Sequence, residues 1–276
     1  MIMKTSIVIL DFEKSTRVLE NVKSILRQNT DFDFEIIVAV NAATPAKRRR
    51  YESLQSNPRV KFIFNEGNLG YTRGINAAVK TARGGFICIV NPDIVWKETD
   101  TLSQLVKFLE DNPKVGLVGP RQINDPEGKV AMTVRAFPDL GTQIARRTWL
   151  RHLPGLREKV AHDEMQHLDY SKTQAVDWLQ SSFWLLRKEL WDDLGGLDER
   201  FFLFMSDPDF CWRVWESGHE VIYFPEATVH ADGLRCSEGG FLSFFKKWTL
   251  RQHLRDAWKY RKKYRGKGSP RATVSN

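Results

Sequence analysis

The chain has 276 residues, of which 42% are hydrophobic and 28% are charged. This length and composition fit one large or two small globular domains and exclude wholesale disorder. No apolar run reaches the roughly 18 residues of a membrane-spanning helix, and the three cysteines lack the CxxC spacing of a zinc or redox site. We therefore expect a globular chain with buried, reduced cysteines.

The net charge of +8 is unevenly distributed along the chain. Residues 241–267 contain ten Lys or Arg side chains and one acid, Asp256, and Arg271 adds one more positive charge. Residues 1–240 therefore carry a net charge of −2. The basic character belongs to the C-terminal segment, so we expect no nucleic-acid partner for the body of the protein.

Strand and helix patterns alternate through the N-terminal half. The predicted strands are Ser6–Leu10, Glu35–Val40, Val60–Phe64, Phe86–Val90 and Val115–Val118, and the predicted helices are Thr16–Gln28, Pro45–Gln55, Tyr71–Ala82 and Thr99–Asp111. Repeated βα units predict an α/β fold with a mostly parallel sheet covered by helices on both faces. The basic run 47–50 is interpreted as a solvated face. The first strand is too short for a signal peptide, so we expect a cytoplasmic protein.

The pattern is looser between residues 131 and 175 and becomes regular again afterwards. Regular patterns return at Val176–Trp178 and Phe183–Leu186, and a helix is predicted at Phe210–Ser217 before a strand at Val221–Phe224. The chain contains no internal repeat and no low-complexity linker.

The C-terminal segment has aromatic and aliphatic residues at helical spacing, with Lys and Arg on the other faces. The stripe contains Phe241, Phe244, Phe245, Trp248, Leu254 and Trp258. A basic helix with an aromatic face is typical of a helix that lies on an anionic membrane surface, and the alternative is a terminal helix that packs on the domain. We expect a domain over residues 1–240 and a basic amphipathic tail over 241–276.

Two acidic clusters stand at predicted strand or loop ends, more than a hundred residues apart. Asn91-Pro92-Asp93 directly follows the apolar run Phe86–Val90, and Asp207-Pro208-Asp209 precedes the predicted helix Phe210–Ser217. An acid at the carboxyl end of a buried strand faces the ligand crevice of an open α/β sheet. A second acid beside it suits transfer of a group from a metal-bound diphosphate to a hydroxyl acceptor.

Six motifs in fixed order carry a resemblance to a known family. They are the strand Ser6–Leu10, the loop Asn65–Gly70, Asn91–Asp93, Gly195–Phe202, Asp207–Arg213, and Pro225 followed by His230. Over about residues 4–240 the chain resembles the family 2 glycosyltransferases of the GT-A fold. Within them it looks most similar to the rhamnosyltransferase-like group that builds bacterial polysaccharides such as the O-antigen of lipopolysaccharide.

The resemblance implies a divalent cation and a catalytic base. Asn91 and Asp93 occupy the place of the family's metal-binding motif, where Mg²⁺ or Mn²⁺ bridges the donor phosphates, and His230 matches a histidine near that metal. Asp207 matches the base that takes the proton of the acceptor hydroxyl. The family usually has an acid before this aspartate, and this chain has Ser206. Asp209 is the alternative base.

The resemblance also implies residues for donor and acceptor. They are Asp11 and Phe12 for the donor and Trp178 and Gln180 for the acceptor. Apart from the resemblance, we expect Asn41, Arg73 and Asn76 on the donor side, and Arg146 and Arg147 against the diphosphate of the acceptor. The family commonly has an aspartate after the second strand, where this chain has Val40. Because valine offers no hydrogen bond to a pyrimidine, Asn41 or Asp11 would substitute.

These observations predict a metal-dependent inverting glycosyltransferase. It would move a sugar such as rhamnose from a nucleotide-diphosphate donor to a lipid-linked glycan, as a peripheral protein at the inner face of the cell membrane. One alternative is a non-catalytic GT-A-like module that binds glycan or membrane, which Val40 and Ser206 favour. The other alternative is a nucleotidyltransferase, but the segment 11–14 after the first strand lacks the glycine- and arginine-rich loop of that class.

Overall fold

The computed structural model describes residues 3–125, 127–137, 142, 145, 149–231 and 242–271. Its strands are β1 (Met3–Asp11), β2 (Asp33–Val40), β3 (Val60–Phe64), β4 (Phe86–Val90), β5 (Ile94–Val95), β6 (Val115–Asn124), β7 (Lys129–Val130), β8 (Val134–Arg135), β9 (Gln174–Ala175), β10 (Trp178–Leu179), β11 (Phe183–Arg187) and β12 (Glu220–Ala231). Its helices are α1 (Ser15–Ile25), α2 (Pro45–Arg50), α3 (Glu52–Gln55), α4 (Gly70–Val79), α5 (Thr101–Asp111), the 3₁₀ helix η1 (Trp149–His152), α7 (Leu156–Asp163), α8 (Lys188–Asp193), α9 (Ser206–Glu216) and α10 (Leu242–Lys263).

Among the described residues, ten strands form one mixed sheet. Its order is β3-β2-β1-β4-β11-β6-β12-β5, with β7 beside β6 and β9 beside β12. The strands β3, β2, β1 and β4 pair in parallel, and β12 is parallel to β6. The strand β11 runs antiparallel between β4 and β6. The predicted mostly parallel α/β sheet is therefore present, with the antiparallel β11 inserted into it.

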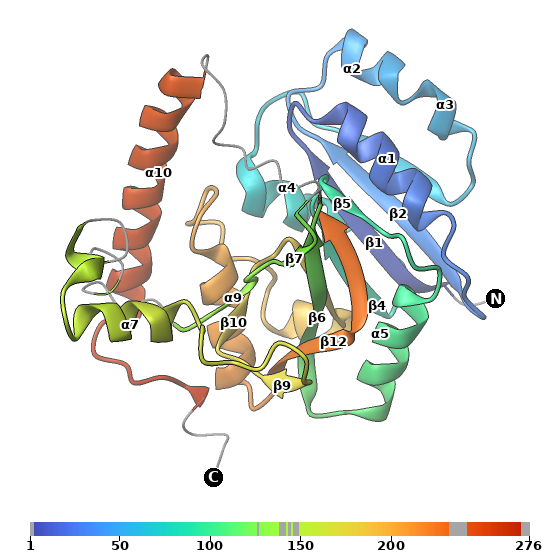
Figure 1. The fold of residues 1–276 in the computed structure, drawn as a ribbon. Helices are drawn as coiled ribbons and strands as arrows, with labels where there is room; N and C mark the ends of the chain where they lie inside the picture. The colour runs from blue at the N-terminus through green and yellow to red at the C-terminus, as the bar shows by residue number, and fades with distance from the viewer. Residues whose placement is uncertain are drawn as a thin grey trace.

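Helices cover both faces of this sheet, as Figure 1 shows. Side chains alternate along β1: Ile7 and Ile9 join the core under α1 and α5, while Val8 joins the core under α4 and α9. This alternation is the period of two of an extended strand, and burial on both faces explains the continuous apolar runs. Cys88 and Cys211 are buried and free, as predicted, and Cys236 lies outside the described residues.

Several predicted elements differ from the structure in extent. The helix predicted at Phe210–Ser217 begins earlier, at Ser206, so Asp207 and Asp209 lie inside α9 and not before it. The predicted helix 45–55 is two short helices, α2 and α3, that meet at Tyr51. Tyr51 is fully buried and its hydroxyl donates to Asp11 at 2.7 Å, so the chain turns inward there. The strands β6 and β12 are longer than predicted, because their pairing resumes at Thr228 after a register shift.

A buried carboxylate joins the start of β2 to the connection between α4 and β4. Glu35 accepts hydrogen bonds from the Ser6 hydroxyl at 2.7 Å and from the Arg83 backbone N–H at 2.8 Å, and Arg83 also forms an ion pair with it. Burial alone would raise the pKa of Glu35, but the bonds from Arg83 and Ser6 lower it. Gly84 is required beside this network, since a Cβ there would lie 2.5 Å from the Ser6 nitrogen.

The described part of the C-terminal segment packs against the rest of the protein. On α10, Gln252, Asp256 and Tyr260 are buried at intervals of four residues, whereas Leu254 and Trp258 are 59% and 65% exposed. Figure 1 shows α10 on the opposite side of the molecule from α1, α2 and α3. The tail predicted as a unit of its own from residue 241 therefore shares a core with the domain. Of the stripe residues whose side chains the structure describes, Leu254 and Trp258 face outward, whereas the Trp248 ring lies 5.8 Å from that of Phe202.

Candidate functional site

The carboxyl ends of β1 and β2 place Asp11 and Asn41 side by side at one edge of the sheet. The Asn41 backbone N–H donates to the Asp11 carbonyl at 2.9 Å. The Asp11 carboxylate is fully buried and accepts from the Lys14 N–H at 2.8 Å and from the Tyr51 hydroxyl at 2.7 Å. Burial and Asp11 both raise the pKa of Tyr51. Asp11 thus holds the loop that leads into α1. This structural role is additional to its predicted contact with the sugar-nucleotide donor.

Asn41 connects the end of β2 to the glycine-containing loop before α4. Its side-chain N–H donates to the Gly70 carbonyl at 3.1 Å, and its side-chain oxygen accepts from the side-chain amide of Asn65 at 3.1 Å. These bonds hold the loop 65–70 beside the strand ends. Asn41 is only 1% exposed, so most of its hydrogen-bonding capacity is used within the protein.

Lys47 was predicted on a solvated face and is instead buried. Its ammonium donates to the carbonyls of Asn41 and Ala42 at 3.1 and 2.9 Å and forms an ion pair with Glu13 at 2.7 Å. It also lies 5.7 Å from the centre of the half-buried Phe12 ring. These two carbonyls, directly after β2, lie away from water and therefore need hydrogen-bond donors from the protein. The ammonium of Lys47 supplies these donors.

Asp93 and Asn91 lie at the turn between β4 and β5. The Asn91 N–H donates to the Ser182 carbonyl at 2.8 Å, and its own carbonyl accepts from Asn21 at 2.7 Å, which fixes the turn between β11 and α1. Asp93 is half-buried, and its carboxylate has no hydrogen bond or ion pair to any of the described residues. It therefore keeps its oxygens available to a ligand.

His230 lies near this turn but is directed to other acids. It pairs with Val95 of β5 along β12, its Nδ1 is 3.3 Å from Asp125 and its Nε2 is 3.6 Å from Glu98. Within the described part of the chain, no group of three His, Cys, Asp or Glu side chains forms a preassembled metal site. The structure thus does not assemble the predicted pair Asp93 and His230 into such a site.

Asp207 lies in the first turn of α9, on the wall of a cavity of about 310 Å³. Its carboxylate accepts from the Ser181 N–H at 3.1 Å, the Ser181 hydroxyl at 3.0 Å and the Ser206 hydroxyl at 3.2 Å. Burial raises the pKa of Asp207, although these bonds act in the opposite direction. A carboxylate with a raised pKa accepts a proton more readily, which suits a general base.

The same cavity brings together residues from both acidic motifs and from the predicted acceptor pocket. Asn91, Trp178, Gln180 and Asp207 all line it. The Trp178 indole N–H donates to the Ala136 carbonyl at 2.7 Å, which fixes the ring at the cavity wall. The two other predicted acceptor residues, Arg146 and Arg147, lie outside the described residues.

Asp209 has surroundings unlike those of Asp207, although only two residues separate them. Asp209 is 0% exposed, forms ion pairs with Arg213 at 3.0 Å and with Lys263 of α10, and accepts from the Tyr264 hydroxyl at 2.8 Å. It does not line the cavity of Asp207. Two cations and a hydroxyl already use its oxygens, so the geometry favours Asp207 as the base.

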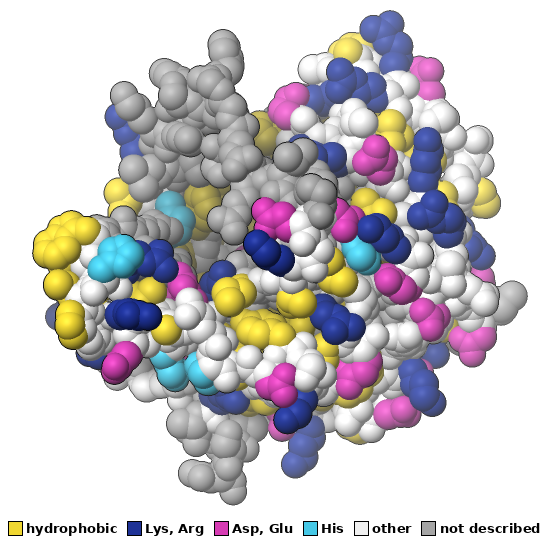
Figure 2. All heavy atoms as spheres, in the orientation of Figure 1, with side chains coloured by type: hydrophobic (Ala, Val, Ile, Leu, Met, Phe, Trp, Pro, Cys, Tyr) yellow, Lys and Arg dark blue, Asp and Glu magenta, His cyan; other side chains and the backbone are white. Residues whose placement is uncertain are grey.

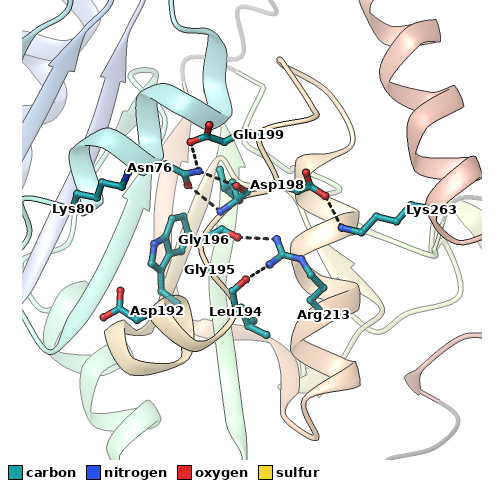
Figure 3. A pocket seen from close by; sticks show the side chains of 12 residues that line it. Asn76, Lys80, Asp192, Leu194, Gly195, Gly196, Asp198, Glu199, Arg213 and Lys263 are labelled. Carbon is teal, nitrogen blue, oxygen red and sulfur yellow. Dashed lines mark hydrogen bonds and ion pairs between the residues drawn. The ribbon is translucent and has the colours of Figure 1, made fainter.

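Asn76 borders a different cavity, of about 580 Å³. Asn76 donates to the Leu197 carbonyl at 2.8 Å and accepts from the Leu197 N–H at 2.9 Å, so it anchors the segment 195–199, as Figure 3 shows. Arg73 forms an exposed pair with Glu199 at 3.5 Å. The structure thus gives both predicted donor residues a contact with the 195–199 segment.

Several charged groups around this larger cavity already have partners within the protein. Lys263 pairs with Asp198 at 2.7 Å, and Arg213 donates to the carbonyls of Leu194 and Gly196 at 2.7 and 2.8 Å (Figure 3). Such paired groups offer little to a ligand. The smaller cavity, which contains the partly buried Asp207, is the better candidate active site.

Sequence reasoning missed Ser181, Tyr71 and His253. The Tyr71 hydroxyl donates to the Ser181 carbonyl at 3.2 Å, and burial together with Asp207 raises the pKa of Tyr71. His253 of α10 lines the cavity with Asp207. No local pattern marks these residues, because each reaches the site through tertiary packing from a distant part of the chain.

Comparisons with known proteins identify the family of this chain. A family model described as "Glycosyl transferase family 2" matches residues 6–194. The chain is 25% identical over 231 residues to an N-acetylglucosaminyl-diphospho-decaprenol L-rhamnosyltransferase of Mycobacterium tuberculosis, which covers 76% of this chain and 70% of that protein. It is 27% identical over 202 residues to the rhamnosyltransferase WbbL of Escherichia coli, which covers 70% of each chain.

A solved structure supports the fold. The mannosyltransferase PcManGT from Pyrobaculum calidifontis, in complex with GDP-Man and Mn²⁺, superposes with a TM-score of 0.63 at 17% sequence identity. The superposition covers 98% of this chain and 67% of that one. The predicted α/β fold class is therefore confirmed.

Replacing Asn76 by alanine is expected to destabilise the protein. The substitution leaves the buried N–H and C=O of Leu197 without partners, and a buried unsatisfied group costs about 1–3 kcal/mol. Urea denaturation measures the change in the free energy of unfolding. Arg73→Ala, one turn earlier on α4, removes only an exposed pair and should change stability by less than about 1 kcal/mol. Equal stability of Asn76→Ala and the wild type would contradict the anchoring role.

Proposed function

Because this chain belongs to glycosyltransferase family 2, we propose that it transfers rhamnose or a related sugar from a nucleoside-diphosphate donor to a hydroxyl of a lipid-linked bacterial glycan, with inversion of the anomeric carbon. One observation supports this most strongly. Asn91 of the first acidic motif and Asp207 of the second line a single cavity, together with Trp178 and Gln180.

In this proposal Asp207 is the general base. Its carboxylate takes the proton of the acceptor hydroxyl while that oxygen forms a bond to the anomeric carbon. The bond from the anomeric carbon to the diphosphate oxygen breaks, and the electron pair leaves with the nucleoside diphosphate. Attack from the face opposite the leaving group inverts the configuration. The neutral donors Ser181 and Ser206 hold the carboxylate without neutralising it.

The available carboxylate of Asp93 fits a divalent cation. Mg²⁺ and Mn²⁺ prefer oxygen ligands, and Mg²⁺ is often bound through one or two carboxylates together with substrate phosphates. Asp93 would hold such an ion, which when bound neutralises charge that develops on the leaving diphosphate. The chain contributes Asn91 beside it, held in place through its backbone by Ser182 and Asn21.

The acceptor side of the cavity suits a sugar. Trp178 presents an aromatic ring that is fixed by its bond to Ala136, and aromatic faces pack well against the apolar faces of sugar rings. The side chain of Gln180 adds an amide on the acceptor side, and its backbone N–H donates to the Thr133 carbonyl at 2.9 Å. The name of the M. tuberculosis relative describes transfer to a lipid diphosphate acceptor, which motivates a lipid-linked glycan here.

The two departures from the family pattern are accommodated. Ser206 is buried and its hydroxyl donates to Asp207, so it contributes to the orientation of the proposed base. Val40 is buried within β2, and Lys47 and Asn41 fill the polar region directly after it. Neither observation favours a non-catalytic binding module over a transferase.

We further propose that the enzyme works as a peripheral protein at the inner face of the cell membrane. The outer face of α10 exposes Leu254 and Trp258 among the exposed cations Arg251 and Arg255, and Lys262 lies 5.6 Å from the Trp258 ring. Such a face combines apolar burial with attraction to anionic lipid.

A second exposed apolar pair lies on the same side of the molecule. Trp149 of η1 and Leu153, directly after it, are 71% and 37% exposed, and Figure 2 shows hydrophobic side chains gathered on the side where α7 and α10 lie. In the described part of the chain, no helix meets the length and hydropathy that crossing a bilayer requires.

Donor binding is expected to depend on metal through Asp93. A nucleoside diphosphate at 100 times its dissociation constant adds about 2.7 kcal/mol to the free energy of unfolding. Thermal unfolding against a panel of nucleoside diphosphates, with and without Mn²⁺, should show stabilisation by one base only with metal. Asp93→Ala should lose this shift, and Asp111→Ala, on the exposed face of α5, should keep it. No shift with any nucleotide from a folded sample would favour a binding module.

Asp207→Asn is expected to lower the transfer rate by a factor on the order of 10²–10⁴ while donor binding is retained, because asparagine cannot accept the proton. The wild-type rate should fall as pH drops through the raised pKa of Asp207, which lies above the ordinary value of about 3.9. Initial rates with the donor found above measure both effects. Near-normal turnover of Asp207→Asn, with loss of activity in a folded Asp209→Asn, would move the role to Asp209.

Membrane binding is expected to depend on the outer face of α10. Replacing Arg251 and Arg255 by glutamine should weaken binding to anionic vesicles by about 2 kcal/mol, or roughly 30-fold, since each basic residue near the surface contributes about 1 kcal/mol. Co-sedimentation with phosphatidylglycerol vesicles measures this. Trp258→Ser should weaken binding as well, whereas Met132→Ser, which removes an exposed apolar side chain elsewhere, should not. Equal binding by all four proteins would contradict the proposal.

A further inference from the structure

The inner face of α10 contains a carboxylate that is unusual for so basic a helix. Asp256 is 0% exposed, and Gln252, one turn earlier, donates to it at 2.9 Å. Its neighbour Lys259 is 3.5 Å away. A buried charge is retained only where hydrogen bonds or ions compensate it, so the groups that face Asp256 indicate its task.

Those groups are three successive backbone N–H groups of one loop. The Asp256 carboxylate accepts from Phe204 at 3.1 Å, from Leu203 at 3.2 Å and more weakly from Phe202 at 3.5 Å. Bonds from backbone N–H groups to a carboxylate are stronger than those between neutral groups. One side chain of α10 therefore anchors the whole loop 202–204.

This loop leads directly to the proposed base. Met205 follows it with a backbone φ of 66°, in the left-handed region that residues other than glycine seldom adopt, and α9 begins at the next residue. Asp207 is the second residue of α9. A fixed left-handed residue between the loop and the helix transmits the position of the loop to the first turn of α9.

The opposite side of the loop is held by α4. The Tyr71 N–H donates to the Phe202 carbonyl at 2.8 Å, and the Thr72 hydroxyl donates to the Phe201 carbonyl. Gly70 has a φ of +76°, and a Cβ there would lie 2.7 Å from the Phe202 ring. The loop is thus held between α4 on one side and α10 on the other.

The loop and α10 also form part of the cavity itself. Leu203, Phe204 and Met205 line it together with His253, whose ring lies 4.7 Å from that of Phe204. A displacement of the loop would therefore move both the cavity wall and Asp207.

Other contacts suffice to dock α10 without Asp256. Tyr260 and Tyr264 form a buried cluster with Phe201 and Trp212, and Lys263 pairs with Asp198 at 2.7 Å and with Asp209. The loss of the Asp256 charge should therefore release the loop while the helix remains in place.

We propose that Asp256 is a positioning residue of the active site, which holds the loop 202–204 and through it sets the placement of Asp207. This inference rests on the proposed function for its kinetic consequence. Its structural consequence, protection of the three loop amides, does not depend on any activity.

The test compares Asp256→Asn with Lys267→Gln. Asparagine keeps the size of the side chain but removes the charge that three N–H groups share. Lys267→Gln removes another link between the C-terminal segment and α9, an exposed pair with Glu216 at 2.7 Å, and touches neither loop nor cavity. Hydrogen exchange measured by mass spectrometry on peptides covering 201–206 reports the loop, and initial rates report kcat and the KM values of donor and acceptor.

We expect faster exchange of the loop amides in Asp256→Asn, with unchanged exchange in β1 and β4. We expect kcat to fall by a factor on the order of 10², as misplacement of a catalytic group does, while the KM of the donor stays constant. Lys267→Gln should match the wild type in both measurements. If Asp256→Asn does not fold, Gln252→Met, which removes the bond that orients Asp256, should show a smaller change in the same direction.

Wild-type exchange and wild-type kcat in a folded Asp256→Asn would overturn the inference. Faster loop exchange with unchanged kcat in an active enzyme would also overturn it, because the loop would then not position the base. A wild-type protein that transfers no sugar from any donor would count against the proposed function instead, and the exchange measurement would still decide whether Asp256 holds the loop.

Discussion

The arrangement of this protein depends on how it compensates carboxylates that are removed from water. A buried carboxylate requires cations or several hydrogen bonds. Glu35 and Asp209 each have a cationic partner, whereas Asp11 and Asp256 bind backbone N–H groups at the ends of loops. Asp207 accepts hydrogen bonds from the neutral groups of Ser181 and Ser206, and unlike Asp209 it lines the cavity. Because burial also raises its pKa, it is the carboxylate best placed to take a proton from a ligand in that cavity.

Within the short segment 207–209, one aspartate stabilises the fold and the other is the proposed base. Asp209 joins α9 to α10 through Lys263 and Tyr264, and it thereby fixes the helix on which Asp207 stands. Among the described residues, the hydrogen bonds to the Asp207 carboxylate come from Ser181 and Ser206. Two aspartates separated by a single residue thus have different surroundings, and the proposed base is the one that has no cationic partner.

Much of the fold could be predicted from the sequence. Strands buried on both faces have continuous apolar runs, so β1, β2 and β4 and the polar residues at their carboxyl ends were identifiable. The placement of Asp207 in a cavity with Asn91 agrees with the motif order. A motif match could not distinguish a polar residue that faces a ligand from one that faces the backbone, and Asn76 faces the backbone of Leu197.

The face of α10 that packs on the domain could not be predicted, for a related physical reason. An apolar stripe is ordinarily assumed to be the buried face of a helix. Here Leu254 and Trp258 remain exposed, because the surface that receives the helix presents backbone N–H groups and the acid Asp209, which select Asp256 and Lys263 instead. The groups on the receiving surface decide which face of a helix packs, and those groups come from distant parts of the chain.

The junction of α10 with the rest of the protein has a consequence for where the chain can be shortened. The family match ends at residue 194 and the recognisable motifs end near 240, so a truncation after residue 240 would look harmless in an alignment. It would uncover the rings of Phe201 and Trp212, remove Lys263 from the buried Asp209, and leave the loop 202–204 without its anchor. Uncovered aromatic surface favours aggregation, so a shortened protein would be expected to fail by becoming insoluble before its lack of activity could be interpreted.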